Sequence, residues 1–162
     1  MSSSLSAWNA RRVALELLGD LRRFDHQLVA LNERITDAVL TSQTTVTEVH
    51  GVGALGAAII VGHTGDITRF PDAGHYARYN GTAPIEASSA LKNRHRLNPR
   101  GNRQLNCALH VAAVTQVAHD TDGRAYYQRK LAEGKTRKEA LRALKRQISN
   151  AVYRRLVADT RR

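Results

Sequence analysis

The chain has 162 residues, which is enough for one domain with an extension and a buried core. Its formal net charge is +11, and its pI is about 10.6. This balance favours a polyanionic partner, with nucleic acid ahead of an anionic membrane surface. No apolar run approaches the roughly 20 residues of a membrane span, and the N-terminus lacks a signal-peptide core. We therefore expect a cytoplasmic protein with no membrane partner.

Cysteine and histidine are placed unfavourably for a metal centre. Cys107 is the only cysteine, which excludes an internal disulfide and a thiolate cluster. Because it stands among Leu105, Ala108 and Leu109, we expect it to be a small buried residue. No histidine lies four residues from another, so zinc is not expected. The sequence thus predicts no metal site and no cofactor in this chain.

A long helix is predicted over residues 7–40, which contain no proline and one glycine. Its apolar residues alternate spacings of three and four for about four heptads, a pattern typical of a coiled-coil seam. Such a helix cannot bury its stripe alone. We assign residues 1–45 to a dimerisation helix, while packing against another helix of the same chain stays open. The seam residues are Ala14, Leu17, Leu21, Phe24, Leu28, Leu31, Ile35 and Ala38.

A Gly-Val-Gly turn at residues 51–53 leads into an alanine-rich helix. It is similar to the hairpin of helix-hairpin-helix motifs, in which glycines let backbone N–H groups approach a phosphate. A tight packing turn between two small-residue helices explains Gly51 and Gly53 equally well. No lysine follows at the spacing of a nucleotide-binding loop.

Residues 46–162 are expected to form a compact helical domain, so the predicted fold class is all-α. Helices are predicted at 72–79, 103–118, 125–132 and 136–158, the last opened by a Thr136–Glu139 capping box. Thr82 to Pro99 reads as a long loop. Such loops are uncommon in compact domains unless they are functional or mobile.

Serines and cations gather in this loop and at its exit. Ser88 and Ser89 precede five cations, and residues 87–105 contain no acid. A hydroxyl can attack a phosphate while guanidinium groups hold it. From the stretch alone, a solvated basic loop that only touches a nucleic-acid backbone is favoured. Together with the glycines of the turn at 51–53, these residues make up the candidate nucleic-acid contacts: Gly51, Gly53, Lys92, Arg94, Arg96, Arg100, Asn102 and Arg103.

Positive charge is also concentrated at the C-terminal end. Residues 124–162 hold 13 Lys and Arg against three acids. A solvated helix face is usually mixed in sign, so this asymmetry indicates a surface that contacts a nucleic-acid backbone.

Several segments together resemble one family. "GDITRF", "YNGTAP" and "RGNRQL" follow the Gly-Val-Gly turn in this order, after the long helix. This resembles the C-terminal transposase domain of the bacterial IS-one-ten insertion-sequence family, the bridge-RNA-guided serine transposases. The resemblance implies a bacterial protein that binds DNA, with guide RNA as a further partner. It also implies DNA strand exchange through a covalent phosphoserine, with Ser89 as the nucleophile and Ser88 as the neighbouring candidate.

Two departures from the family pattern matter. Ala90 stands where the family usually has glycine beside the nucleophile. The N-terminal RuvC-like domain, whose acids bind Mg²⁺ in the family, is not found in this sequence. We therefore expect nucleic-acid binding with little or no strand transfer by this chain alone. The alternatives are a non-catalytic helical nucleic-acid-binding module and a coiled-coil assembly protein whose charge serves solubility.

Overall fold

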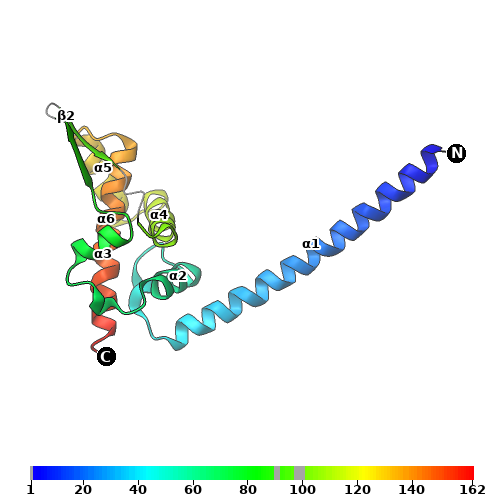
Figure 1. The fold of residues 1–162 in the computed structure, drawn as a ribbon, viewed down its shortest axis with the longest axis horizontal. Helices are drawn as coiled ribbons and strands as arrows, with labels where there is room; N and C mark the ends of the chain where they lie inside the picture. The colour runs from blue at the N-terminus through cyan, green and yellow to red at the C-terminus, as the bar shows by residue number, and fades with distance from the viewer. Residues whose placement is uncertain (1, 90–91, 97–100) are drawn as a thin grey trace. The chain divides into compact units, whose positions relative to one another are not determined.

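The computed structural model describes the backbone of residues 2–89, 92–96 and 101–162, and side chains for 8–84 and 101–162. The chain divides into two compact units, residues 1–38 and 39–162. Figure 1 shows a single long helix in blue and cyan and a compact group of elements in green to red.

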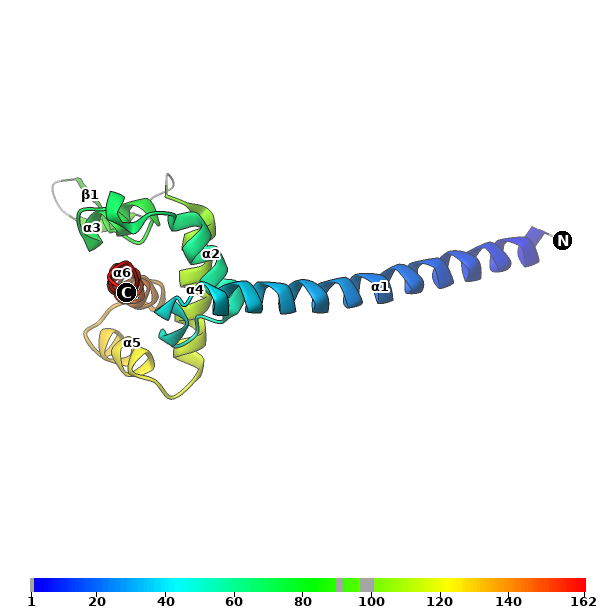
Figure 2. The ribbon, with the colours of Figure 1, turned by 90° about the horizontal axis from the view of Figure 1, so that it is seen from below.

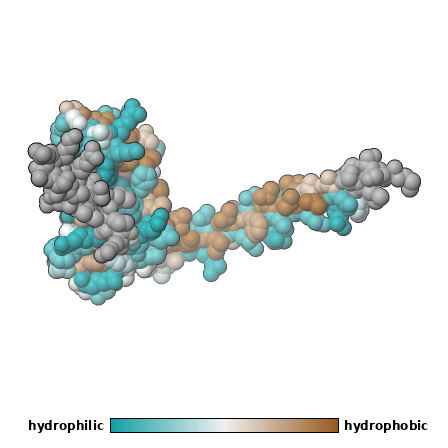
Figure 3. All heavy atoms as spheres, turned by 45° about the horizontal axis from the view of Figure 1, so that its top comes forward, coloured by the Kyte–Doolittle hydropathy of each residue, from teal (hydrophilic) through white to brown (hydrophobic). Residues whose placement is uncertain are grey.

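Helix α1 (Ser2–Thr41) makes up the first unit and reaches into the second. The seam predicted from heptad spacing lies on its surface: Leu21 is 60% exposed, Phe24 52% and Leu28 58%. Apolar residues appear as brown patches along the helix in Figure 3. The helix thus forms as predicted, with its apolar stripe uncovered.

The second unit consists of short helices and one small hairpin. In chain order its elements are η1 (Thr45–Glu48), α2 (Ala54–Thr64), η2 (Ile67–Arg69), α3 (Ala73–Tyr79), β1 (Ile85–Ser89), β2 (Lys92–Arg96), α4 (Arg103–Ala118), α5 (Asp122–Ala132) and α6 (Arg137–Asp159).

Helix α6 is the element on which α3, α4 and α5 pack. Figure 2 views it end-on with these helices around it. It begins with the predicted capping box, in which Thr136 and Glu139 bond each other's backbone N–H. Its inward face carries the core residues Ala140, Leu144, Ile148, Val152 and Leu156.

The predominantly helical class and the long N-terminal helix are confirmed. The predicted loop is different: its residues include an antiparallel pair in which Ile85 is opposite Arg96 and Ser89 is opposite Lys92. The strand sequences are polar and poor in β-branched residues, which is why propensity favours a loop there. No helix among the described residues is both long and apolar enough to span a membrane.

Cys107 is exposed, so the prediction of a buried cysteine is wrong. In α4 the buried face runs through Leu105, Ala108, Leu109 and Ala112. Cys107 lies two positions after Leu105, about 200° around the helix axis, and therefore faces away from that stripe.

Candidate nucleic-acid interface

Two glycines bring together the ends of the segment that carries the serines. A Cβ atom on Gly101 would lie 2.6 Å from both the N and the Cα atom of Gly81. Real Cβ atoms essentially never approach backbone this closely, so this contact requires glycine at position 101. Residues 80–81 and Gly101 therefore meet at the base of the hairpin.

Asn80 holds this base from within the core. Its side chain is fully buried, and its Nδ2 donates to Ser149 Oγ of α6 at 2.8 Å. Its Oδ1 accepts from the N–H and hydroxyl of Thr82 at 3.1 and 2.7 Å. Because a buried amide is costly unless its hydrogen bonds are made, these three bonds select one position for the start of the hairpin.

Asn106 and Lys145 continue the polar network. Asn106 Nδ2 donates to the carbonyl of Asn80 at 3.0 Å, and its Oδ1 accepts from Lys145 Nζ at 2.7 Å. Lys145 is only 6% exposed. This burial lowers the pKa of its ammonium group from the ordinary value, with a smaller opposing effect from Cys107.

A second cluster lies at the N-terminus of α4. Asn102 caps this helix, since its Oδ1 accepts from the N–H groups of Gln104 and Leu105 at 3.0 and 3.1 Å. Its Nδ2 lies 3.4 Å from the hydroxyl of Tyr79, and that hydroxyl donates to the carbonyl of His63 at 3.1 Å. Asn102 is thus fixed at the exit of the hairpin.

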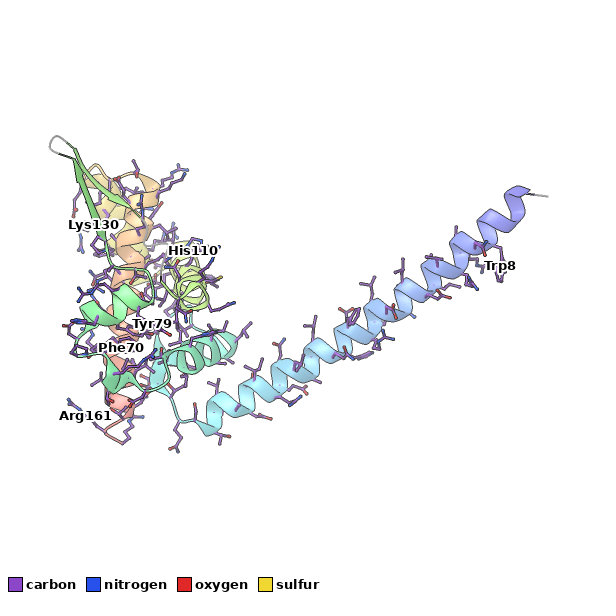
Figure 4. The ribbon with its side chains drawn as sticks, in the orientation of Figure 1. Trp8, Phe70, Tyr79, His110, Lys130 and Arg161 are labelled. Carbon is purple, nitrogen blue, oxygen red and sulfur yellow. The ribbon has the colours of Figure 1, made fainter. Side chains whose placement is uncertain are left out.

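Arg69 adds a cation to this cluster. Its guanidinium lies 4.6 Å from the ring centroids of both Phe70 and Tyr79, two residues that lie near each other in Figure 4. The hydrogen bond from Asn102 and then the contact with Arg69 lower the pKa of Tyr79, against a small effect of burial. An exposed guanidinium held over aromatic rings is suited to contact a phosphate.

Strand register separates the predicted site residues into two sets. Successive residues of a strand alternate between its two faces, and directly paired residues share a face. Ser89 therefore shares a face with Lys92, Arg94 and Arg96, whereas Ser88 shares the other with Asn93 and His95. Arg100 lies outside the described residues. Arg103 is exposed at the first position of α4.

The two glycines of the Gly-Val-Gly turn have different surroundings. Gly51 adopts φ +83°, and a Cβ there would lie 2.8 Å from the carbonyl oxygen of Ala112 in α4. Gly53 is the N-cap of α2, and a Cβ there would meet nothing within 4 Å. Gly51 is thus needed for packing, while the backbone at Gly53 is open to approach.

Three of the described carboxylates have structural roles. Asp66 and Asp72 cap η2 and α3, and Asp159 accepts hydrogen bonds from Thr44 and Thr45. No three His, Cys, Asp or Glu side chains among the described residues form a group that could hold a metal ion. The described residues therefore do not offer the donor set of a divalent metal site.

Sequence comparison agrees with this arrangement of motifs. Residues 43–128, just over half of the chain, match the family model described as Transposase IS116/IS110/IS902 family. The chain belongs to this family. The matched segment runs from η1 into α5, so it contains the turn at 51–53, the hairpin and the Asn102 cluster. It leaves out α1 and α6.

Three proteins of insertion elements are similar to this chain. The 43.6 kDa protein of IS110 from Streptomyces coelicolor is 37% identical over 94% of this chain and 35% of its own length. The 44.8 kDa protein of IS116 from Streptomyces clavuligerus is 31% identical over 86% of this chain and 37% of its own. The 42 kDa protein of IS900 from Mycobacterium paratuberculosis is 29% identical over 81% and 36%. The chain spans about a third of the length of these relatives.

Some residues at the hairpin base are not among the sequence-predicted contacts. Arg69 and Tyr79 lie in "GDITRF" and "YNGTAP", and Lys145 lies in the basic C-terminal helix, but no local motif marks them individually. For Arg69 and Tyr79 the available signal is that they lie in segments that resemble the family, and for Lys145 it is the excess of positive charge in residues 124–162. Only the fold brings them beside Asn102 and Asn106.

Proposed function

We propose that this chain is the DNA-binding domain of an IS116/IS110/IS902-family transposase, with Ser89 as the nucleophile for DNA strand exchange. The observation that carries the proposal is the strand register. Ser89 is paired with Lys92, on the face that also holds Arg94 and Arg96. A hydroxyl on the cationic face of a hairpin is suited to approach a phosphodiester whose negative charge those cations offset.

The proposed step exchanges one phosphoester for another. The Ser89 oxygen attacks the phosphorus, a serine–phosphate bond forms, and the bond from phosphorus to one sugar oxygen breaks. The serine proton ends on that sugar oxygen, so atoms and charge balance without a further reactant. A hydroxyl of another DNA strand then attacks the phosphoserine and releases Ser89. The ester bond energy is kept throughout, because water is not consumed.

Ser88 is the second candidate for the same role. It lies on the opposite face of the hairpin, with Asn93 and His95 in place of the three cations. The register therefore favours Ser89. Arg100 and Arg103 remain proposed phosphate contacts, and Asn102 positions the exit of the hairpin through its cap of α4.

The catalytic test uses a transposase of the same length as the relatives, with this chain as its C-terminal part. With a DNA substrate, the wild-type enzyme is expected to give a protein–DNA adduct that survives denaturation. Ser89→Ala should abolish the adduct, and Ser88→Ala should leave it within a few-fold of wild type. Adduct formation by Ser89→Ala would overturn the assignment. The chain alone is expected to bind DNA with little or no strand transfer, and supply of Mg²⁺ by a RuvC-like domain stays a prediction.

Binding is tested on the chain alone. Anisotropy of labelled duplex DNA should fall steeply with salt, since each neutralised phosphate contributes a log–log slope of about −0.9. A flat response would contradict both this proposal and its alternative.

The alternative is a non-catalytic helical module that binds nucleic acid through the turn at 51–53 and the C-terminal cations. Gly53 favours it, because α2 begins there with no side-chain cap and with open space above the glycine. This alternative predicts that the chain binds nucleic acid tightly and in a salt-dependent way, and that the full-length enzyme forms no serine–DNA adduct.

We also propose that α1 pairs with a second copy of the chain. Its seam residues keep heptad spacing, and Leu17, Leu21, Phe24, Leu28 and Leu31 among them are between 47% and 60% exposed. A stripe of this kind is covered when two such helices pack knobs into holes.

A further inference from the structure

A pocket of about 270 Å³ lies beside the start of the hairpin. One wall is the link 81–84 between α3 and β1, and the other walls come from Tyr126 of α5 and from the N-terminal half of α6. The volume is just below the range of about 300–1,000 Å³ usual for small-molecule sites. It is suited to one nucleotide-sized group.

The lining combines apolar surface with cations. Ala83, Pro84 and Ala143 are apolar, while Lys135, Arg142, Lys145 and Arg146 carry positive charge. Glu139 is the one acid among the described lining residues, and its carboxylate is held in the capping box by the N–H and hydroxyl of Thr136 at 2.9 and 2.7 Å. The described lining residues therefore carry a net positive charge.

Lys145 points most directly to an anion. Its side chain is almost fully buried, and its ammonium donates to a neutral amide, Asn106. Among the residues whose side chains are described, no carboxylate lies within ion-pair distance of Lys145. A buried ammonium is costly without an opposite charge, so the site is stabilised when an anion enters.

Arg146 and Tyr126 supply the other parts of the site. Arg146 Nη1 donates to the carbonyl of Ala73 at 3.0 Å, which fixes the guanidinium in the wall. Tyr126 lines the pocket, and Arg129 and Lys130, which are not among its described lining residues, lie 5.1 and 5.4 Å from the centroid of its ring. An aromatic ring beside cations is what binds an unstacked base together with its phosphate.

We propose that this pocket holds one nucleotide of a single-stranded nucleic acid, with the phosphate against Lys145 and Arg146 and the base against Tyr126. The inference rests on the proposed nucleic-acid-binding function. It adds a second contact point, separate from the serine face of the hairpin, at which a strand is anchored by a nucleotide taken out of its stack. Such a strand is either displaced DNA or RNA.

The test measures anisotropy of labelled oligo(dT), oligo(rU) and a mixed-sequence duplex with the chain. Tyr126→Leu should weaken binding of a single strand about tenfold, and Tyr126→Phe should keep it, because only the ring is required. Lys145→Met should weaken binding of the same single-stranded probe by a similar factor. The two Tyr126 variants should leave duplex binding no weaker than the control Arg154→Gln, which removes an exposed charge of α6 that is not among the described lining residues.

The outcomes separate the inference from the proposed function. Absence of binding to every probe at moderate salt would remove the proposed function. If the chain binds duplex DNA and Tyr126→Leu keeps wild-type affinity for single strands, the nucleotide-pocket proposal is wrong while the proposed function stands. If Lys145→Met unfolds, the comparison of Tyr126→Leu with Tyr126→Phe still tests the pocket. A larger Tyr126→Leu loss on oligo(dT) identifies DNA as the occupant, and a larger loss on oligo(rU) identifies RNA.

Discussion

The two units of the chain differ in the exposure of their apolar side chains. In the second unit, Leu105, Leu109 and Val152 are fully buried, and the polar groups among them are tied to one another. In α1, Leu15, Leu21 and Leu28 are each close to 60% exposed. Fully burying one such side chain is worth about 1.5–3 kcal/mol. The second unit gains this from its own fold, whereas α1 leaves these side chains exposed.

This difference can be followed spectroscopically within one chain. Trp8, the only tryptophan, is in α1, and it is labelled in Figure 4. All five tyrosines are in the second unit. Tryptophan emission thus reports on the helix and tyrosine on the compact unit.

The largest expected effect is on association through α1. Leu28→Glu places a charge at a seam position, and a two-fold pair would carry the charge twice. We expect self-association to weaken at least a hundredfold, measured by sedimentation equilibrium, with unfolding of the compact unit unchanged.

Leu15→Glu is the matched control, since Leu15 is equally exposed but lies off the heptad seam. Equal losses of association in both variants, or a monomeric wild-type chain at tens of micromolar, would contradict pairing through the predicted seam.

A glycine-to-alanine change should have opposite signs in the two units. Gly51→Ala forces a Cβ to 2.8 Å from Ala112 O at φ +83°, so the compact unit should lose about 1–3 kcal/mol in urea unfolding. Gly19→Ala meets nothing within 4 Å. Alanine is the better helix former by up to about 1 kcal/mol, and helicity of α1 should rise in circular dichroism. A stabilised Gly51→Ala variant would show that the contact with α4 is not tight.

Local pattern was sufficient for the helices and insufficient for the base of the hairpin. The heptads, the Thr136–Glu139 capping box and the buried face of α4 are all periodic or short-range features, so sequence spacing predicts them. Contacts such as Asn80 with Ser149 join residues far apart in the chain, and no local rule marks either partner.

The candidate site divides in the same way. Composition indicates serines beside cations, and the family resemblance favours Ser89, while the pairing of β1 with β2 adds that Ser88 and Ser89 lie on opposite faces of the hairpin. Gly51 illustrates the converse. A Gly-x-Gly turn is compatible with phosphate approach or with packing, and the choice depends on α4, which is about sixty residues further along. Lys145 reads as one more surface cation until its burial is known.

The smallest expected effect concerns Asp159, which joins the two ends of the compact unit. Its carboxylate accepts from Thr44 Oγ1 at 2.9 Å, Thr45 N at 2.9 Å and Thr45 Oγ1 at 2.7 Å. Partial burial raises the pKa of this carboxyl group. The hydrogen bonds from Thr45 and Thr44 lower the pKa, and together they outweigh the effect of burial, so the pKa lies below its ordinary value of 3.8.

A carboxyl group whose pKa is lower in the folded state stabilises that state above the unfolded pKa, and this contribution is lost as the pH falls through the folded pKa. Asp159→Asn should therefore cost about 1 kcal/mol at neutral pH, a modest value because the group is partly solvated. The difference between wild type and variant should shrink as the pH falls below about 3.8.

Urea unfolding followed by tyrosine fluorescence across this range measures the difference. The other acids remain in both proteins and cancel. Asp25→Asn, the same change on exposed α1, should leave the compact unit unaffected at every pH. A pH-independent loss in Asp159→Asn would mean that the charge of the carboxylate contributes nothing, and that its place at the end of α6 is set by shape alone.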